Sequence, residues 1–163
     1  MRPLVLVMLL STLAAAGDAA AVLAPSKASQ LVTLTAGGGC PIAGHTTDTG
    51  FTQRATSDGA LVPFGIPAKQ ALLLTNIDVS FTNQVVNDNV GVFLVAGSNT
   101  PGTIIAGRVV AVPAGGVGSV TFTPPNGIAI KSGTSLCVSV VNFTRGGQVS
   151  VFGIAHGFLA ADK

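Results

Sequence analysis

The stretch "ALLLTNIDVSFT", residues 71–82, alternates apolar and polar side chains over most of its length. In an extended strand, one face would carry Leu73, Thr75, Ile77, Val79 and Phe81, and the other would carry Asn76, Asp78, Ser80 and Thr82. Such alternation is typical of a strand that packs on a core with one face and meets solvent with the other. The stretch therefore predicts an antiparallel sheet with one side facing solvent.

The rest of the chain also has the pattern of short β-strands separated by turns. Its 21 glycines and 9 prolines separate short segments rich in Val, Ile, Thr and Phe. We expect strands at residues 31–35, 51–55, 61–64, 72–82, 90–96, 108–112, 117–123, 128–130, 136–143 and 148–154. Because the helical segments that a parallel sheet needs are missing, the sequence predicts an all-β, antiparallel β-sandwich, jelly-roll-like, with an N-terminal arm.

Two of the expected strands are apolar on both faces. In "VGVFLVA", which starts at Val90, alternate positions pair Val92 and Leu94 against Phe93 and Val95. In "QVSVFGI", which starts at Gln148, they pair Val149 and Val151 against Phe152 and Ile154. Only one set in each strand can enter a shared core, so we expect the other set to be covered by the N-terminal arm or by a neighbouring subunit.

The N-terminus has the pattern of a secretory signal peptide. Arg2 gives a positive start, residues 4–16 are apolar, and the small residues "AAAGDAAA" follow. The apolar stretch is shorter than the roughly 20 residues of a membrane span. We therefore expect residues 1–20 to be a cleaved signal peptide, residues 21–60 an arm packed on the domain, and residues 61–163 the sandwich core. The mature chain would be secreted or periplasmic, with no membrane insertion after signal cleavage.

Charge is scarce in this chain. Only 9% of its residues are charged, against about 25% in a typical soluble domain, and the formal net charge is +2. The basic residues are scattered singly, so nucleic acid is not an expected partner. A surface with so little charge favours association, and we expect a homo-oligomer, with a surface protein or a glycan as another possible partner.

Both cysteines fall outside the predicted signal peptide. Cys137 would point to the face opposite Leu136, Val138 and Val140, while Cys40 lies in the loop-like segment "AGGGCPIAG". An exported chain with two cysteines is most simply explained by one intramolecular disulfide between Cys40 and Cys137. Two buried free thiols and an intermolecular bridge are the alternatives.

Residues that could carry chemistry are few. His45 and Asp48 in "GHTTDTG" could begin a metal site or an acid–base pair, and the alternative for His45 is a solvated loop histidine. His156 in "GIAHGFL" is interpreted as a hydrogen-bonded, partly buried imidazole. We therefore assign no catalytic residue, no metal ligand and no cofactor.

The stretches "FTPPNGIAIKSGTSLCVSV" and "VSVFGIAHGFL" resemble the closing strands of jelly-roll-type sandwiches in exported and phage-encoded proteins. The resemblance implies a fold and carries over no functional residues.

The expected function is that of an exported, non-enzymatic β-sandwich module with a structural or interaction role. One alternative is a glycan- or lipid-binding module, although the chain has neither of the aromatic residues, Trp and Tyr, that combine a large ring with a polar group. The other alternative is a small metal-dependent or hydrolytic enzyme.

Overall fold

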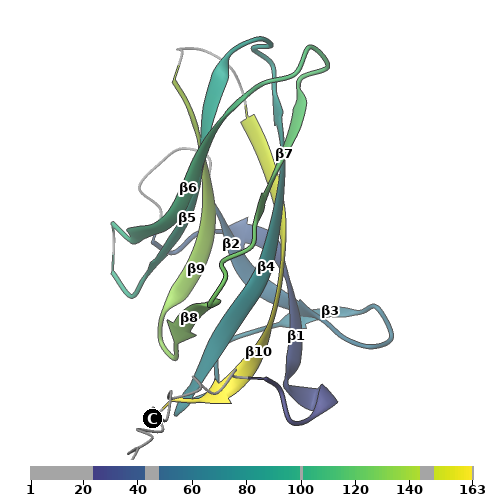
Figure 1. Cartoon of the computed structure of the whole chain (residues 1–163), viewed down its shortest axis with the longest axis vertical. Helices are drawn as coiled ribbons and strands as arrows, with labels where there is room; N and C mark the ends of the chain where they lie inside the picture. Colours follow the sequence, from purple (N-terminus) through teal and green to yellow (C-terminus); the bar gives the residue numbers. More distant parts are fainter. Residues whose placement is uncertain (1–23, 43–47, 100, 144–148, 163) are drawn as a thin grey trace, which may run out of the picture.

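The computed structural model describes residues 24–42, 48–99, 101–143 and 149–162 (Figure 1). A short 3₁₀ turn, η1 (Ala28–Gln30), precedes the first strand. The strands are β1 (Leu31–Gly39), β2 (Asp48–Ala55), β3 (Leu61–Pro63), β4 (Gln70–Asn83), β5 (Asn89–Gly97), β6 (Thr103–Ala111), β7 (Val117–Phe122), β8 (Ile128–Lys131), β9 (Ser135–Asn142) and β10 (Val149–Ala161). Within these ranges, no helix has the length and hydropathy needed to cross a membrane.

All strands join one antiparallel sheet. Its order is β6-β5-β9-β2-β1-β10-β4-β7, with β3 on β2 and β8 on β4. β2 pairs with β9 only through Asp48–Gly50, and with β1 from Thr49 to Arg54. The sheet curls into two layers, with β5, β6 and β9 on one side of the molecule in Figure 1 and β4, β7 and β10 on the other. The predicted all-β, jelly-roll-like antiparallel sandwich is confirmed.

The core lies between the two layers. It is built from alternate residues of both, as expected when each layer turns one face inward. β5 and β9 contribute Val90, Val92, Leu94, Val138 and Val140, and the opposite layer contributes Leu34, Ile77, Val79, Phe81, Val120 and Phe122.

The N-terminal region differs from the expected arm. β1 is hydrogen-bonded to β10 on one side and to β2 on the other, and β2 in turn pairs with β9. β1 and β2 are therefore central strands of the sheet, and among the described residues only the short segment 40–42 crosses its outer surface in the way an arm would. The predicted signal peptide, residues 1–20, lies outside the described residues.

A bulge in β4 overturns part of the predicted alternation. His156 pairs with Asn76, but the next residue of β10, Gly157, pairs with Leu74, so Thr75 is an extra residue in β4. The extra residue reverses the faces on its N-terminal side: Leu72 and Leu74 are buried, while Thr75 is exposed. The prediction that Leu73 and Thr75 face the core is wrong, whereas Ile77, Val79 and Phe81 are buried as predicted.

Candidate interaction surface

The two faces of β5 have different surroundings. Val90, Val92 and Leu94 point into the core, where their side chains are fully buried. The opposite face carries Gly91, Phe93 and Val95, and Val95 is 8% exposed while Phe93 is half-buried. The structure thus confirms that β5 is apolar on both faces and that its second face is at least partly covered.

The neighbouring strands extend this outer face. Residues directly opposite each other in antiparallel strands point to the same side of the sheet. The β5 residues Gly91, Phe93 and Val95 face Val109, Gly107 and Ile104 of β6, and Val141, Ser139 and Cys137 of β9. Six of these nine residues are apolar, two are glycines and one is Ser139, so the outer face of this layer is uncharged and mainly apolar across three strands.

The glycines of this face make room for an aromatic ring. A Cβ atom placed on Gly91 would lie 2.4 Å from the ring of Phe93, and one on Gly107 would lie 2.5 Å from the same ring. The ring of Phe143 is also close, 3.0 Å from a Cβ on Gly91. Phe93 therefore lies flat over two glycines, and its ring forms part of the surface.

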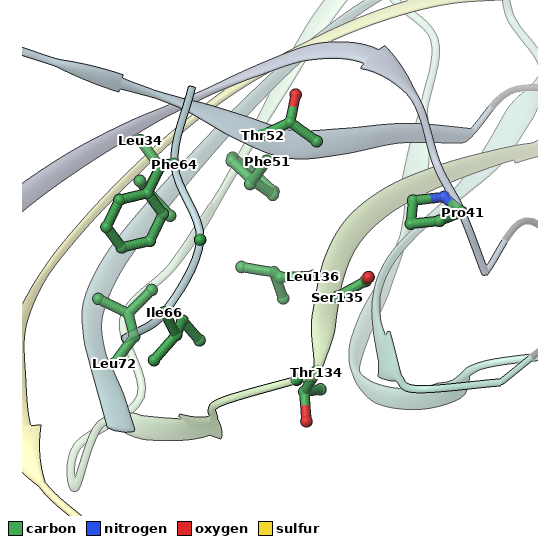
Figure 2. Close-up of a pocket in the computed structure, with 12 residues that line it drawn as sticks. Leu34, Pro41, Phe51, Thr52, Phe64, Ile66, Leu72, Thr134, Ser135 and Leu136 are labelled. Atoms are coloured by element: carbon green, nitrogen blue, oxygen red, sulfur yellow. The ribbon is translucent and has the colours of Figure 1, made fainter. Parts of the chain in front are cut away.

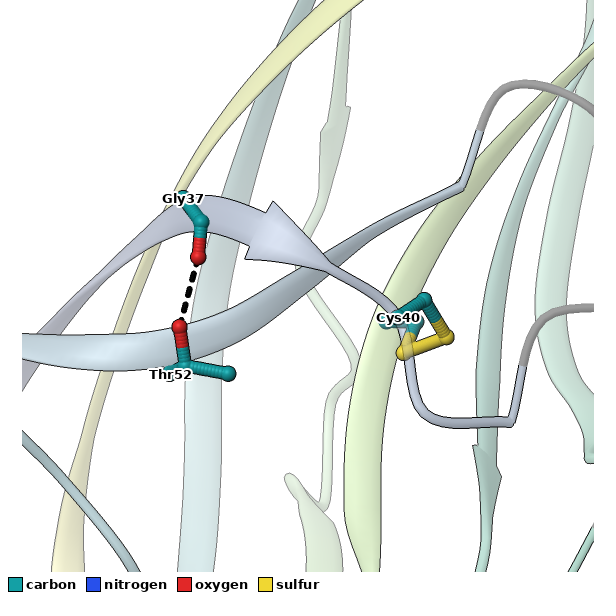
Figure 3. The surroundings of a disulfide bond; sticks show 4 residues. Gly37, Cys40 and Thr52 are labelled. Atoms are coloured by element: carbon teal, nitrogen blue, oxygen red, sulfur yellow. Dashed lines mark hydrogen bonds between the residues drawn. A yellow bond between two sulfur atoms is a disulfide. The ribbon is translucent and has the colours of Figure 1, made fainter.

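The segment with the disulfide covers the β9 side of this face. Cys40 and Cys137 are joined by a disulfide with a Cα–Cα distance of 5.9 Å, the pairing that the sequence predicts. Ile42, only 3% exposed, packs in one cluster with Val95 and Cys137. Figure 3 shows the chain passing from the end of β1 over β9, beside the hydrogen bond of 2.6 Å in which the Thr52 hydroxyl donates to the Gly37 carbonyl.

The β6 side of the same face is open. Ile104 and Val109 of β6 are 54% and 62% exposed, and Phe143, which follows β9 and lies beside Gly91, is 55% exposed. We name Phe93, Ile104, Val109 and Phe143 the β5–β6 patch. Sequence reasoning identified Phe93 but missed Ile104, because the strand expected there begins only at residue 108. The available signal was the run of three β-branched residues at 103–105, which favours a strand.

The outer face of the other layer is mainly polar. The side chain of Asp78 accepts hydrogen bonds from the Asn76 amide at 2.6 Å and from the Thr121 hydroxyl at 2.7 Å. Phe152 of β10 is 50% exposed on this layer. Among the described residues no segment of the chain covers Phe152, so the N-terminal arm does not cover it there, and cover of this face of β10 by a neighbouring subunit stays a prediction.

Within the described residues, no catalytic or metal site forms around a histidine. His156 is exposed, not partly buried as predicted, and its Nδ1 lies 3.2 Å from the Thr33 hydroxyl. His45 lies outside the described residues, and Asp48 is the first residue of β2. In the described part of the chain, no three His, Cys, Asp or Glu side chains gather as metal ligands would.

One carboxyl group has a shifted pKa. The Thr56 hydroxyl donates to Asp58 in the turn after β2, and this bond, aided by backbone N–H groups, lowers the pKa of that carboxyl. Asp58 is fully exposed and is not part of the β5–β6 patch. Its titration therefore gives no reason to expect chemistry at the patch.

Comparisons with known proteins add little to this picture. No family model matches the chain, and no curated protein matches it. Among solved structures, the chain is similar to one from the naturally occurring empty particles of cowpea mosaic virus top component, at 14% identity and TM-score 0.36 over 81% of this chain and 85% of that one. A chain of the cowpea mosaic virus empty virus-like particle has 15% identity and TM-score 0.35, with 86% and 87% covered. One from broad bean stain virus has 14% identity and TM-score 0.36, with 85% and 84% covered. At such low similarity, nothing about the function of this chain follows from those particles.

Proposed function

We propose that the mature chain is an exported, non-enzymatic structural module that assembles with copies of itself through the β5–β6 patch. The observation that carries the proposal is an uncharged apolar surface in which half-buried Phe93 of β5 adjoins the exposed Ile104 and Val109 of β6. β6 has only one hydrogen-bonded neighbour in the described sheet. Soluble monomers rarely expose contiguous apolar surface without a use for it.

The free energy gained by burying apolar area favours a second copy of the chain as the partner that covers the β5–β6 patch. A stable contact buries about 800 Å² per partner, and each Å² of apolar area removed from water contributes about 25 cal/mol. The net charge of +2 gives little repulsion between copies. The free edge of β6 also offers backbone N–H and C=O groups that a neighbouring strand can pair with.

Export is supported by two independent features. The first residues have the charge, apolar and small-residue order of a signal peptide. The disulfide between Cys40 and Cys137 fits an oxidising compartment, where such bonds form and persist. Secretion or a periplasmic location follows as part of the proposal.

A pair of matched valines tests the assembly surface. Val109, 62% exposed, belongs to the β5–β6 patch, and Val117, 60% exposed, lies on β7 of the opposite layer. Val109→Asp would bury an unpaired carboxylate on assembly, and we expect the dissociation constant to rise about 100-fold or more. Val117→Asp should leave the dissociation constant within about threefold of the wild-type value, since substitutions at exposed positions rarely change the free energy by more than about 0.5 kcal/mol.

Sedimentation velocity over a concentration series measures both variants. Equal assembly of Val109→Asp and wild type, with circular dichroism unchanged, would remove the patch from the interface. Disruption by Val117→Asp alone would place the contact on the layer that carries Phe152.

A further inference from the structure

A cavity opens between the two layers at the end where the β8–β9 turn lies. Its volume is about 280 Å³. Figure 2 shows apolar side chains from several elements around one hollow, with Leu34 from β1, Phe51 from β2 and Leu136 from β9. Clefts of this kind, lined mainly by apolar side chains with a few polar groups, are where small ligands usually bind.

The floor of the cavity belongs to the core. Leu34, Phe51, Leu72 and Leu136 are between 1% and 6% exposed. One wall is formed by Phe64 and Ile66, which follow β3 and pack as partly buried side chains against the core. The mouth is bordered by exposed residues, Pro41, Gly65 and Gly133, so the cavity is open to solvent.

The chemistry of the lining selects the ligand. No lining side chain is titratable, so nothing there pairs with a charged group. The side-chain polar atoms are hydroxyls, and that of Thr52 already donates to the Gly37 carbonyl. The apolar side chains of the floor offer water no hydrogen-bond partner, and the hydroxyls of Thr134 and Ser135 belong to the residues that directly follow Gly133 at the mouth.

We infer that this cavity binds the neutral alkyl or acyl chain of a small amphiphile, with the polar end of the molecule at the mouth beside Thr134 and Ser135. An apolar cavity of about 150 Å³ takes up one benzene, so a cavity of 280 Å³ has room for about ten carbons. The β5–β6 patch contributes no residue to the site, and the inference does not rest on self-association.

A series of straight-chain alcohols from butanol to decanol tests the site on the full mature chain. Affinity, measured by calorimetry, should rise about fourfold with each added methylene until the cavity is full. Methyl NMR signals of Leu34, Leu72 and Leu136 should shift together in saturable fashion. Unsaturable binding, or shifts spread over the whole surface, would overturn the site.

Two tryptophan variants of neighbouring residues sharpen the test. Ile66→Trp should fill the cavity and weaken octanol binding at least tenfold, whereas Val62→Trp, at an exposed residue of β3 outside the lining, should leave it unchanged. Thermal melting checks that both variants are folded. Wild-type affinity in a folded Ile66→Trp would contradict the inference, and the wild-type NMR shifts decide the matter if that variant fails to fold.

Discussion

Phenylalanine and glycine act as pairs in this sandwich. The ring of Phe93 lies over Gly91 and Gly107 on the outer face, and the fully buried ring of Phe81 lies over Gly118, its partner across β4 and β7. Of these glycines, only Gly107 lies outside the strands expected from the sequence. In the structure, Gly107 and Gly118 lie within strands, because a neighbouring ring occupies the space of their absent side chains.

Gly118→Ala should therefore destabilise the fold. The added Cβ would lie 2.3 Å from the ring of Phe81, which cannot move away inside the core. Overpacking of this kind costs about 1–3 kcal/mol. Gly115→Ala is the matched control, since its Cβ would meet no atom within 4 Å. Urea denaturation measures both, and equal midpoints would show that Phe81 moves aside freely.

Removal of the disulfide should loosen one face and leave the sheet folded. Cys40 and Cys137 close a loop with a sequence separation of 97, for which chain entropy gives a gain of about 4–5 kcal/mol at most. We expect Cys40→Ala/Cys137→Ala to lose about 2–4 kcal/mol in denaturation and to expose Val95 as Ile42 detaches. Non-reduced wild type should weigh two hydrogens less than the reduced form, and two thiols that react with an alkylating agent in native protein would contradict the bond.

At the scale of elements, the strands were predictable and their lengths were less so. β6 begins at Thr103, five positions before the predicted start at residue 108, and β10 runs to Ala161, beyond the predicted end at residue 154. At β6 the predicted boundary followed Gly107, which lies inside the strand. A Cβ on Gly153 of β10 would meet the ring of Phe51 at 2.9 Å, a contact that no local pattern reveals.

The candidate surface was predictable only in part. The two apolar faces of β5 follow from alternation within a single strand. Which half is covered depends on where β1 ends and where the segment 40–42 crosses β9, and that is set by the topology of the whole sheet. The bulge at Thr75 was invisible for the same reason, since it is defined by pairing with β10.

Gly157→Ala tests that bulge. The chain of β4 passes so close that an added Cβ would lie 2.2 Å from the Leu73 carbonyl oxygen, which is backbone and cannot rotate away. We expect a loss of about 2 kcal/mol or more, with the bulge straightened or the pairing of β10 and β4 weakened. Gly65→Ala, with nothing within 4 Å of its Cβ, is the control. Native stability in Gly157→Ala, measured by thermal melting, would mean that the two strands are not this close.

At the scale of the whole molecule, the first prediction concerns export. Cleavage between Ala16 and Ala24 should leave exported protein without its first residues, because small residues follow the apolar stretch there. Intact mass spectrometry of protein recovered outside the cytoplasm measures the cleavage point. An exported species that keeps Met1 would contradict the signal peptide and weaken the argument from compartment to disulfide.

The central claim is that the β5–β6 patch is covered by a second copy. The chain supplies a cover for the β9 side through Ile42, and in the described residues it supplies none for Ile104 and Val109. Light scattering on the mature, disulfide-bonded protein at micromolar concentration is the most direct test. We expect a mass of two or more monomers that falls on dilution, and a monomer mass across the whole concentration range would contradict self-association.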